Sequence, residues 1–271
     1  MGFKMQWDQT GEHLYRTGID RGVIYDVNSN GEYVDGEVWN GLTGFTKSPS
    51  GAEETKLYAD NIKYLSLRSA EDFGATITCY TFPKLFEIKN GSVEVADGVK
   101  IYQQARKSFG LCVRTLIGND VDGNDKGYEL HLCYGLTASP SEEAYNTVND
   151  SPEAVEFSYE LASVPVEVGG NYKPTAVITI SSLTADGDKL ADLEAALYGA
   201  AADTYVPVTW AKSTDNPSTK GWYELSGSTY SASEDTEVSS SKTYYKKLTA
   251  GDAHMPLPAE VIQMMTVSTG G

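Results

Sequence analysis

The sequence predicts a mainly β protein, a β-sandwich or barrel with one flanking α-helix and a small β insertion domain. Three observations predict this fold class. Runs of alternating apolar and polar residues recur along the chain, which is the period of a half-buried strand. Asn-Gly and Asp-Gly pairs, which accept the positive φ angles of tight hairpin turns, separate several of these runs. Apolar residues at helical spacing are convincing in one segment alone.

Strands are expected where the alternation is clearest. Turn residues bound each run, and the regular spacing of the runs favours a sandwich or barrel. The expected strands cover residues 23–25, 75–80, 111–117, 128–134, 154–161 and 175–180. The expected hairpin turns are Asn30-Gly31, Asn90-Gly91, Asp97-Gly98 and Asp122-Gly123.

One helix is expected from Asp188 to Tyr198. Its apolar stripe consists of leucines at i, i+3 and i+7, namely Leu190, Leu193 and Leu197. Asp186 or Asp188 is suited to cap the first turn, and Gly199 is suited to end the helix. A second, short helix is expected to begin at Ser141, because the two glutamates that follow favour the positive end of a helix dipole.

The composition changes after Gly199 and predicts three segments. Residues 1–202 form the first part of a β domain, residues 203–249 a β insertion, and residues 250–271 a C-terminal segment that completes the first domain. The insertion holds 17 Ser or Thr among its 47 residues, and its charges nearly cancel. Short strands are expected at 222–225 and 243–246. An insertion so clearly delimited is expected on an exposed loop.

The charge excludes one class of function. The chain has 271 residues, with 21 Lys and Arg against 38 Asp and Glu, and a formal net charge of −17. Proteins that grip nucleic-acid backbones need clustered Lys and Arg, so this chain is poorly suited to that task. No apolar stretch reaches the roughly 18 residues that a membrane-spanning helix needs. The first ten residues are polar and lack the apolar core of a signal peptide, so the cytoplasm is the expected site of synthesis.

The residue types that carry catalysis and metal binding are scattered along the sequence. His13, His131 and His254 are far apart and have no metalloprotease spacing. No phosphate-binding loop or nucleophile elbow is found in the sequence. The cysteines lie in strand-like runs and are expected to be small buried apolar residues; they are Cys79, Cys112 and Cys133. We therefore expect a non-enzymatic protein with no catalytic site, no metal site and no cofactor.

The segment from Asn119 to Gly127 has two interpretations. Counted from Asp120, its side chains fit the first, third and fifth ligands of a calcium loop. The sixth position is Asp125 where glycine is needed, and the twelfth is His131 where a bidentate glutamate is needed. A hairpin turn between the flanking strands is therefore the expected structure.

The stretch from Leu42 to Arg68 alternates weakly and is too apolar for a solvated linker. We interpret it as an arm that packs against another chain, because aliphatic and aromatic anchors dominate interface energies. The expected anchors are Leu57, Tyr58, Ile62 and Tyr64. The alternative is a loop that folds back on its own domain.

Nine segments carry a resemblance to a known family. They are Gly18–Val23, Val38–Leu42, Ser48–Glu53, Leu57–Leu65, Glu71–Ile77, Phe109–Asp120, Asn149–Pro152, Lys189–Gly199 and Met255–Pro258. Taken in this order, they resemble the major tail protein, or tail tube protein, of long-tailed bacteriophages that infect Gram-positive bacteria. The matches spread over about residues 1–200 and 250–262, whereas residues 203–249 depart from the family pattern.

The resemblance implies a tail-tube-type β-sandwich. Six copies would form a ring, and the rings would stack into a tube that conducts DNA into the host. It implies a structural protein of the virion tail, made in the host bacterial cytoplasm. The implied partners are other copies of the chain and tail proteins such as the tape measure, tail-tip and terminator proteins. Genomic DNA would pass through the lumen without specific binding, and no membrane partner is implied. A long β-hairpin in such proteins typically reaches the adjacent ring.

A second class of function stays open at this point. The insertion is rich in aromatic residues that would form an exterior surface for stacking on sugar rings, namely Trp210, Trp222, Tyr223 and Tyr230. The protein would then be a carbohydrate-binding or host-adhesion module. The competing interpretation makes these residues the core of the insertion, because a domain of about 45 residues needs every aromatic it has.

Overall fold

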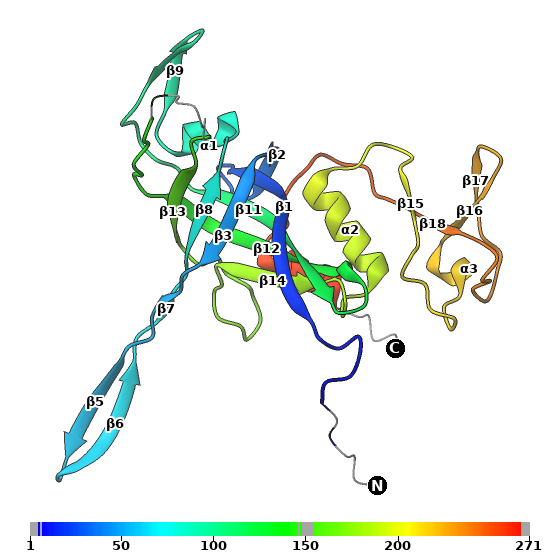
Figure 1. Ribbon diagram of the computed structural model, residues 1–271, viewed down its shortest axis with the longest axis horizontal. Helices are drawn as coiled ribbons and strands as arrows, with labels where there is room; N and C mark the ends of the chain where they lie inside the picture. Colours follow the sequence, from blue (N-terminus) through cyan, green and yellow to red (C-terminus); the bar gives the residue numbers. More distant parts are fainter. Residues whose placement is uncertain (1–4, 6, 146, 148–153, 267–271) are drawn as a thin grey trace.

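One eight-stranded antiparallel sheet dominates the computed structural model, which describes residues 5, 7–145, 147 and 154–266 (Figure 1). Its strand order is β2-β1-β11-β12-β13-β8-β3, and β14 pairs with the middle of β12. The strands are β1 (Tyr15–Val27), β2 (Tyr33–Trp39), β3 (Leu42–Lys47), β8 (Gly74–Cys79), β11 (Phe109–Asn119), β12 (Gly123–Ala138), β13 (Phe157–Ser163) and β14 (Val177–Ser181).

The sheet folds over on itself near the end of β12. Residues 129–133 of this strand pair with β14, whereas residues 136–138 pair with β13. Gly135 lies between them with a φ of +59°, and an added Cβ would lie 2.1 Å from the carbonyl oxygen of Val164. Glycine alone tolerates such a bend at no steric cost. The two halves of the sheet enclose a core whose largest buried side chains are Trp39, Phe86, Phe109 and Tyr159.

Two helices cover the opposite face of the first half of the sheet. Helix α2 (Gly187–Tyr198) packs its leucine stripe, and α4 (Pro258–Met265) lies beside it in the same apolar cluster. That cluster includes Leu190, Leu193, Leu197, Leu130, Leu132 and Tyr134. The Asp186 carboxylate accepts hydrogen bonds from the backbone N–H groups of Asp188 and Lys189, and Gly199 ends the helix, as expected. Among the described residues, no helix is long and apolar enough to cross a membrane.

The structure confirms the mainly β fold class, the six expected strands of the main sheet and the helix over Asp188–Tyr198. The helix expected from Ser141 is wrong, because Ser141–Tyr145 has no regular structure. There the Glu143 carboxylate accepts hydrogen bonds from the hydroxyls of Tyr145 and Tyr159 instead. The matched segment Asn149–Pro152 lies outside the described residues.

The pair Asn90-Gly91 is not a hairpin turn. It ends helix α1 (Lys84–Lys89), where the backbone N–H groups of Asn90 and Gly91 donate to carbonyls of the last turn. Alternation analysis also missed α3 (Pro217–Lys220) and α4. Helices of four to eight residues contain too few turns for apolar periodicity to stand out.

A separate four-stranded sheet lies within residues 203–249. Its order is β15-β18-β16-β17, with β15 (Tyr205–Pro207), β16 (Tyr223–Ser226), β17 (Thr229–Ala232) and β18 (Tyr244–Lys247). The chain enters and leaves this region at one place, because Ala200 and Gly251 exchange two backbone hydrogen bonds of 3.0 Å. The small sheet lies beside α2 (Figure 1).

Two hairpins project from the main sheet (Figure 1). The first, here called the arm hairpin, comprises β5 (Glu54–Ala59) and β6 (Ile62–Arg68), with β4 (Ser50–Gly51) and β7 (Glu71–Asp72) at its base. The second, here called the valine hairpin, comprises β9 (Val93–Ala96) and β10 (Val99–Ile101). Neither hairpin pairs with the main sheet.

Candidate interaction surface

The arm hairpin is an extension of the main sheet. The first six residues of the stretch predicted as an arm, Leu42–Lys47, are strand β3, so the free arm begins later than expected. Backbone hydrogen bonds then continue the β3–β8 ladder outward, with Ser48 N donating to Gly74 O and Ala52 N to Ala70 O. These bonds bridge the gaps between three separate ladders, β3–β8, β4–β7 and β5–β6, and so tie the arm hairpin to the end of the main sheet.

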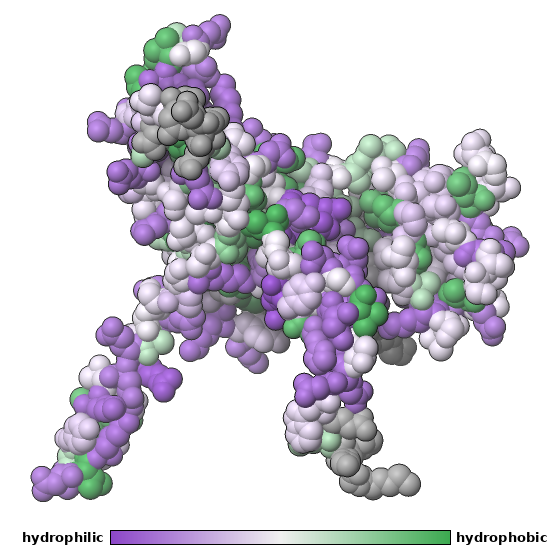
Figure 2. All heavy atoms as spheres, viewed as in Figure 1, coloured by the Kyte–Doolittle hydropathy of each residue, from purple (hydrophilic) through white to green (hydrophobic). Residues whose placement is uncertain are grey.

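All four expected anchors lie on the arm hairpin and are exposed. Leu57, Tyr58, Ile62 and Tyr64 expose 43–72% of their surface, and Leu65 and Leu67 are also exposed. Figure 2 shows the arm hairpin standing clear of the body, with hydrophobic residues near its tip. The alternative of a loop folded back on its own domain is wrong, since every residue of β5 and all but one of β6 are exposed.

The strand register places the exposed residues on two different faces. Leu57 pairs with Leu65, and Thr55 pairs with Leu67, so these leucines share one face. The residues that alternate with them on β5 include Glu54, and its carboxylate is 2.6 Å from Lys63 Nζ. One face of the arm hairpin is therefore apolar and the other is ion-paired.

The expected anchors are thus only partly grouped by the fold. Tyr58 follows Leu57 directly and so points to the ion-paired face. Ile62 pairs with Ala59, two positions after Leu57, and therefore lies on the apolar face. Leu65 and Leu67, which were not among the expected anchors, complete that face. Their signal in the sequence is the alternation Leu65-Ser66-Leu67, which becomes visible once the hairpin turn at Asp60-Asn61 is known.

The expected exterior aromatic surface is wrong for Trp222. This side chain is fully buried, and its Nε1 donates a 2.7 Å hydrogen bond to Asp188 Oδ1. It packs with Tyr244 and Val208, and Trp210 packs partly buried against the same cluster. The indoles therefore belong to the core of the small sheet, because that sheet needs a buried apolar centre of its own.

Four tyrosines gather on the other face of the small sheet. Tyr205 stacks on Tyr230 with ring centres 4.0 Å apart, and Tyr223 and Tyr245 meet these rings edge-on. The register explains the grouping, since Tyr223 pairs with Tyr245 and Leu225 with Tyr230. Each of the four side chains is half-buried. Of the expected aromatic surface, Tyr223 and Tyr230 belong to this cluster.

The acidic segment Asn119–Gly127 forms the turn between β11 and β12. Asn119 is buried, and its amide oxygen accepts hydrogen bonds from the N–H groups of Val121 and Asp122. Asp120 accepts from the N–H of Gly11, and Asp122 pairs with Lys126 at 3.1 Å. These carboxylates therefore bind the protein's own groups and hold the N-terminal segment against the turn.

The cysteines and His131 are structural residues of the core. Cys79, Cys112 and Cys133 are free and buried, and burial raises the thiol pKa of Cys79 to about 11 and of Cys133 to about 12. Burial, aided by the nearby Lys47 ammonium, lowers the pKa of His131 to about 4. Lys47 Nζ donates to Nδ1 at 2.9 Å, so the neutral ring carries its proton on Nε2 and donates to Thr115.

Comparison with known proteins shows a distant structural similarity. No family model matches the chain, and no curated protein matches it. Among solved structures, it is similar to a chain of the sheath-tube complex of an extracellular contractile injection system (PVC), determined by cryo-electron microscopy in the extended state. The match covers 59% of this chain and 88% of that chain, with 13% identity and a TM-score of 0.29.

Proposed function

We propose that the protein is a structural subunit of a phage tail tube, which assembles with copies of itself into stacked hexameric rings. The observation that carries the proposal is the apolar face of the arm hairpin. A two-stranded hairpin with an uncovered leucine face is marginally stable in water. A second copy of the chain that covers this leucine face removes the leucines from water and leaves the fold of the main sheet unchanged.

One edge of the main sheet supports the same proposal. Strand β3 lies at one end of the strand order, and exposed edges invite pairing with other chains. The strand at the other end, β2, is covered by the chain itself, because Gly36 N donates to Ala253 O and Met255 N donates to Tyr33 O. A closed ring of copies covers such edges, and each subunit then presents two different surfaces to its neighbours. Six copies per ring is the number that the resemblance to tail tube proteins implies.

The charge suits a conduit for DNA. A net charge of −17 per subunit repels phosphate groups, so DNA slides through a lumen without binding. The function proposed is mechanical, and no catalytic or cofactor chemistry enters it.

Negative-stain electron microscopy across a range of concentrations tests the proposal. We expect rings or tubes with a central hole from the parent chain, and folded single subunits or unstacked rings from Leu57→Asp/Leu65→Asp. Lys56→Asp is the matched control, since it changes the charge by the same amount on the ion-paired face. Single subunits of the parent chain at every concentration would overturn self-assembly, and tubes from the leucine variant would overturn the role of the apolar face.

The tyrosine cluster favours a second function, carbohydrate binding on the exterior of the assembly. Half-buried rings on one sheet face offer stacking surfaces for sugars. The test is a glycan array with the parent chain and Tyr205→Ala/Tyr245→Ala. Glycan retention lost in a variant whose far-UV circular dichroism is unchanged supports binding, whereas a parent chain that retains no glycan excludes it.

A further inference from the structure

The valine hairpin repeats the design of the arm hairpin at the other end of the molecule. Val93 pairs with Ile101 and Glu94 with Lys100, so aliphatic and charged side chains lie on opposite faces. Four aliphatic side chains remain 40–56% exposed on this short ribbon, namely Val93, Val95, Val99 and Ile101. Both projecting hairpins show hydrophobic residues in the space-filling view (Figure 2).

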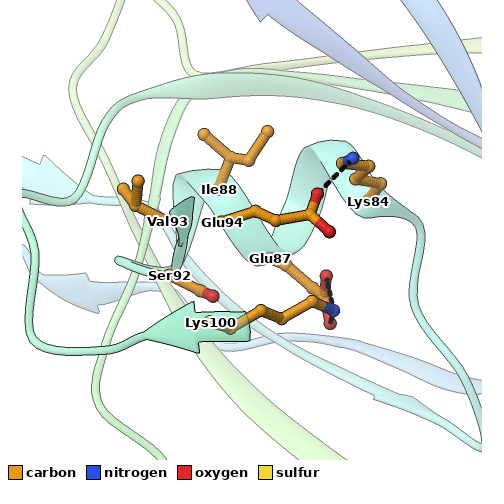
Figure 3. A pocket seen from close by; sticks show the side chains of 7 residues that line it. All are labelled: Lys84, Glu87, Ile88, Ser92, Val93, Glu94 and Lys100. Carbon is orange, nitrogen blue, oxygen red and sulfur yellow. Dashed lines mark hydrogen bonds and ion pairs between the residues drawn. The ribbon is translucent and has the colours of Figure 1, made fainter. Parts of the chain in front are cut away.

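The charged face of the valine hairpin is already occupied by helix α1. Glu94 lies 2.6 Å from Lys84, and Lys100 lies 2.6 Å from Glu87, so two ion pairs join the hairpin to the helix. Figure 3 shows both pairs, with Ile88 and Val93 beside them, around a shallow pocket of about 310 Å³. These contacts orient the hairpin. Val93 lies at the pocket beside the helix, whereas Val95, Val99 and Ile101 remain exposed.

The two hairpins lie at opposite ends of one strand. Strand β8 begins at Gly74, directly after the base of the arm hairpin, and ends at Cys79, directly before the turn into α1. Copies stacked along the direction of β8 therefore bring the arm hairpin of one copy toward the valine hairpin of the next. A head-to-tail contact of this kind joins two different surfaces and repeats without limit, as a tube requires.

The charges of both hairpins allow copies to approach there. A net charge of −17 makes whole subunits repel each other. Residues 53–68 nonetheless carry three acidic and three basic side chains, and residues 92–102 carry Glu94 and Asp97 against Lys100. The two ribbons are thus close to neutral in a strongly acidic chain, so contact between them adds little repulsion.

We propose that the aliphatic face of the valine hairpin is the docking surface for the apolar face of the arm hairpin of a second copy of this chain. The proposal rests on the self-assembly proposed above and names the receiving side of that contact. Leu57, Leu65 and Leu67 of one copy cover Val95, Val99 and Ile101 of the next.

The test uses the full chain with Val95→Asp/Val99→Asp. We expect this variant to fold, as judged by circular dichroism and its thermal transition, and to lose stacked assemblies by about tenfold or more in sedimentation velocity. The matched control is Gln103→Asp/Gln104→Asp, which adds the same charge beside the hairpin on exposed positions and should assemble like the parent.

Mixing identifies the surfaces that meet. The leucine variant, Leu57→Asp/Leu65→Asp, keeps an unaltered valine hairpin. The valine variant, Val95→Asp/Val99→Asp, keeps an unaltered arm hairpin. Each alone is expected to leave unstacked species, and an equimolar mixture is expected to form pairs of unlike copies or layers. If arms dock on arms instead, the valine variant alone assembles like the parent, which overturns the inference.

A crosslink gives a second measurement. Leu65→Cys in one copy and Val95→Cys in another place the new thiols at the proposed contact, and the native thiols are buried. We expect an oxidised dimer from the mixture, and its absence where the parent chain assembles overturns the inference. A parent chain that never assembles overturns the proposed function, whereas normal assembly by the valine variant overturns this inference alone.

Discussion

The indole nitrogen of Trp222 donates a 2.7 Å hydrogen bond to the carboxylate of Asp188, in the first turn of helix α2. The same carboxylate lies 2.9 Å from Lys220. A second contact follows one turn along the helix, where Lys246 lies 3.0 Å from Asp192. The small sheet is therefore fastened to the body along one side of α2.

Trp222→Phe tests this fastening. The change removes a hydrogen bond to a charged, largely buried acceptor and leaves a gap in the small core, so we expect a loss of about 2 kcal/mol in the free energy of unfolding. Urea denaturation followed by circular dichroism measures the loss. Thr229→Ala, on exposed strand β17, is the control and should change the stability little. A variant as stable as the parent would show that the bond contributes nothing.

Deletion of residues 203–249 should leave assembly intact. Ala200 and Gly251 are hydrogen-bonded to each other at the base of the segment, so a short glycine linker can close the gap. The deletion exposes one side of α2, which predicts a lower melting temperature. Electron microscopy of the deleted chain measures the outcome. Aggregates or permanent single subunits would show that the small sheet takes part in assembly.

The arm hairpin predicts different effects for its two faces. Tyr58→Asp/Ile62→Asp is expected to block tube extension while the subunit stays folded, because both side chains are exposed near the tip of the hairpin. Tyr58→Asp alone alters only the ion-paired face, so the size of its block, compared with that of the Leu57→Asp/Leu65→Asp variant, measures how far the contact extends beyond the apolar face. Tubes of normal length from the double variant would limit the contact to the leucines.

The stability of the protein should fall between pH 6.5 and about 4 because of His131. Its pKa is lowered to about 4 in the folded protein, so the unfolded chain takes up a proton in this window and the folded protein does not. The contribution of neutral His131 to the free energy of unfolding is fully present above pH 6.5 and falls by about 3 kcal/mol as the pH approaches 4.

The neighbouring charged groups act in another window. Pairing with Arg16 lowers the pKa of Glu129, so its stabilisation is lost as the pH falls below the ordinary range of a glutamate. Urea denaturation at a series of pH values measures the slope. His131→Gln should flatten it between pH 6.5 and 5, and an unchanged slope would assign the effect to other groups.

Gly135→Ala tests the bend that makes two layers from one sheet. The new Cβ would meet the carbonyl of Val164 at 2.1 Å, in a backbone conformation with φ of +59°. We expect a loss of more than about 2 kcal/mol in the free energy of unfolding. Gly98→Ala is a control, because φ is also positive there and no atom lies within 4 Å of its added Cβ. Equal effects of the two substitutions would show that the close approach to Val164 is unimportant.

The local patterns of the sequence determined the strands, the helix over Asp188–Tyr198 and the buried state of the three cysteines. These features depend on side chains a few positions apart, because alternation and helical spacing are properties of neighbouring residues. The sequence pattern did not predict the short helices α1, α3 and α4 or the end of α1 at Asn90, because segments of four to eight residues contain too few turns to show apolar periodicity.

For the candidate interaction surface too, the sequence predicted some features and the tertiary structure decided others. The sequence alone identified Leu57 and its neighbours as apolar residues outside the core, since the stretch lacks the alternation of a buried strand. Only the tertiary structure decided that Leu57 shares a face with Leu65 and that Tyr58 does not, because the face of a strand residue depends on the register with its partner. Likewise, Trp222 and Tyr223 are adjacent in sequence, but the sheet buries the first and leaves the second on its outer face. Burial is decided by the elements that pack over a residue, and those elements come from distant parts of the chain.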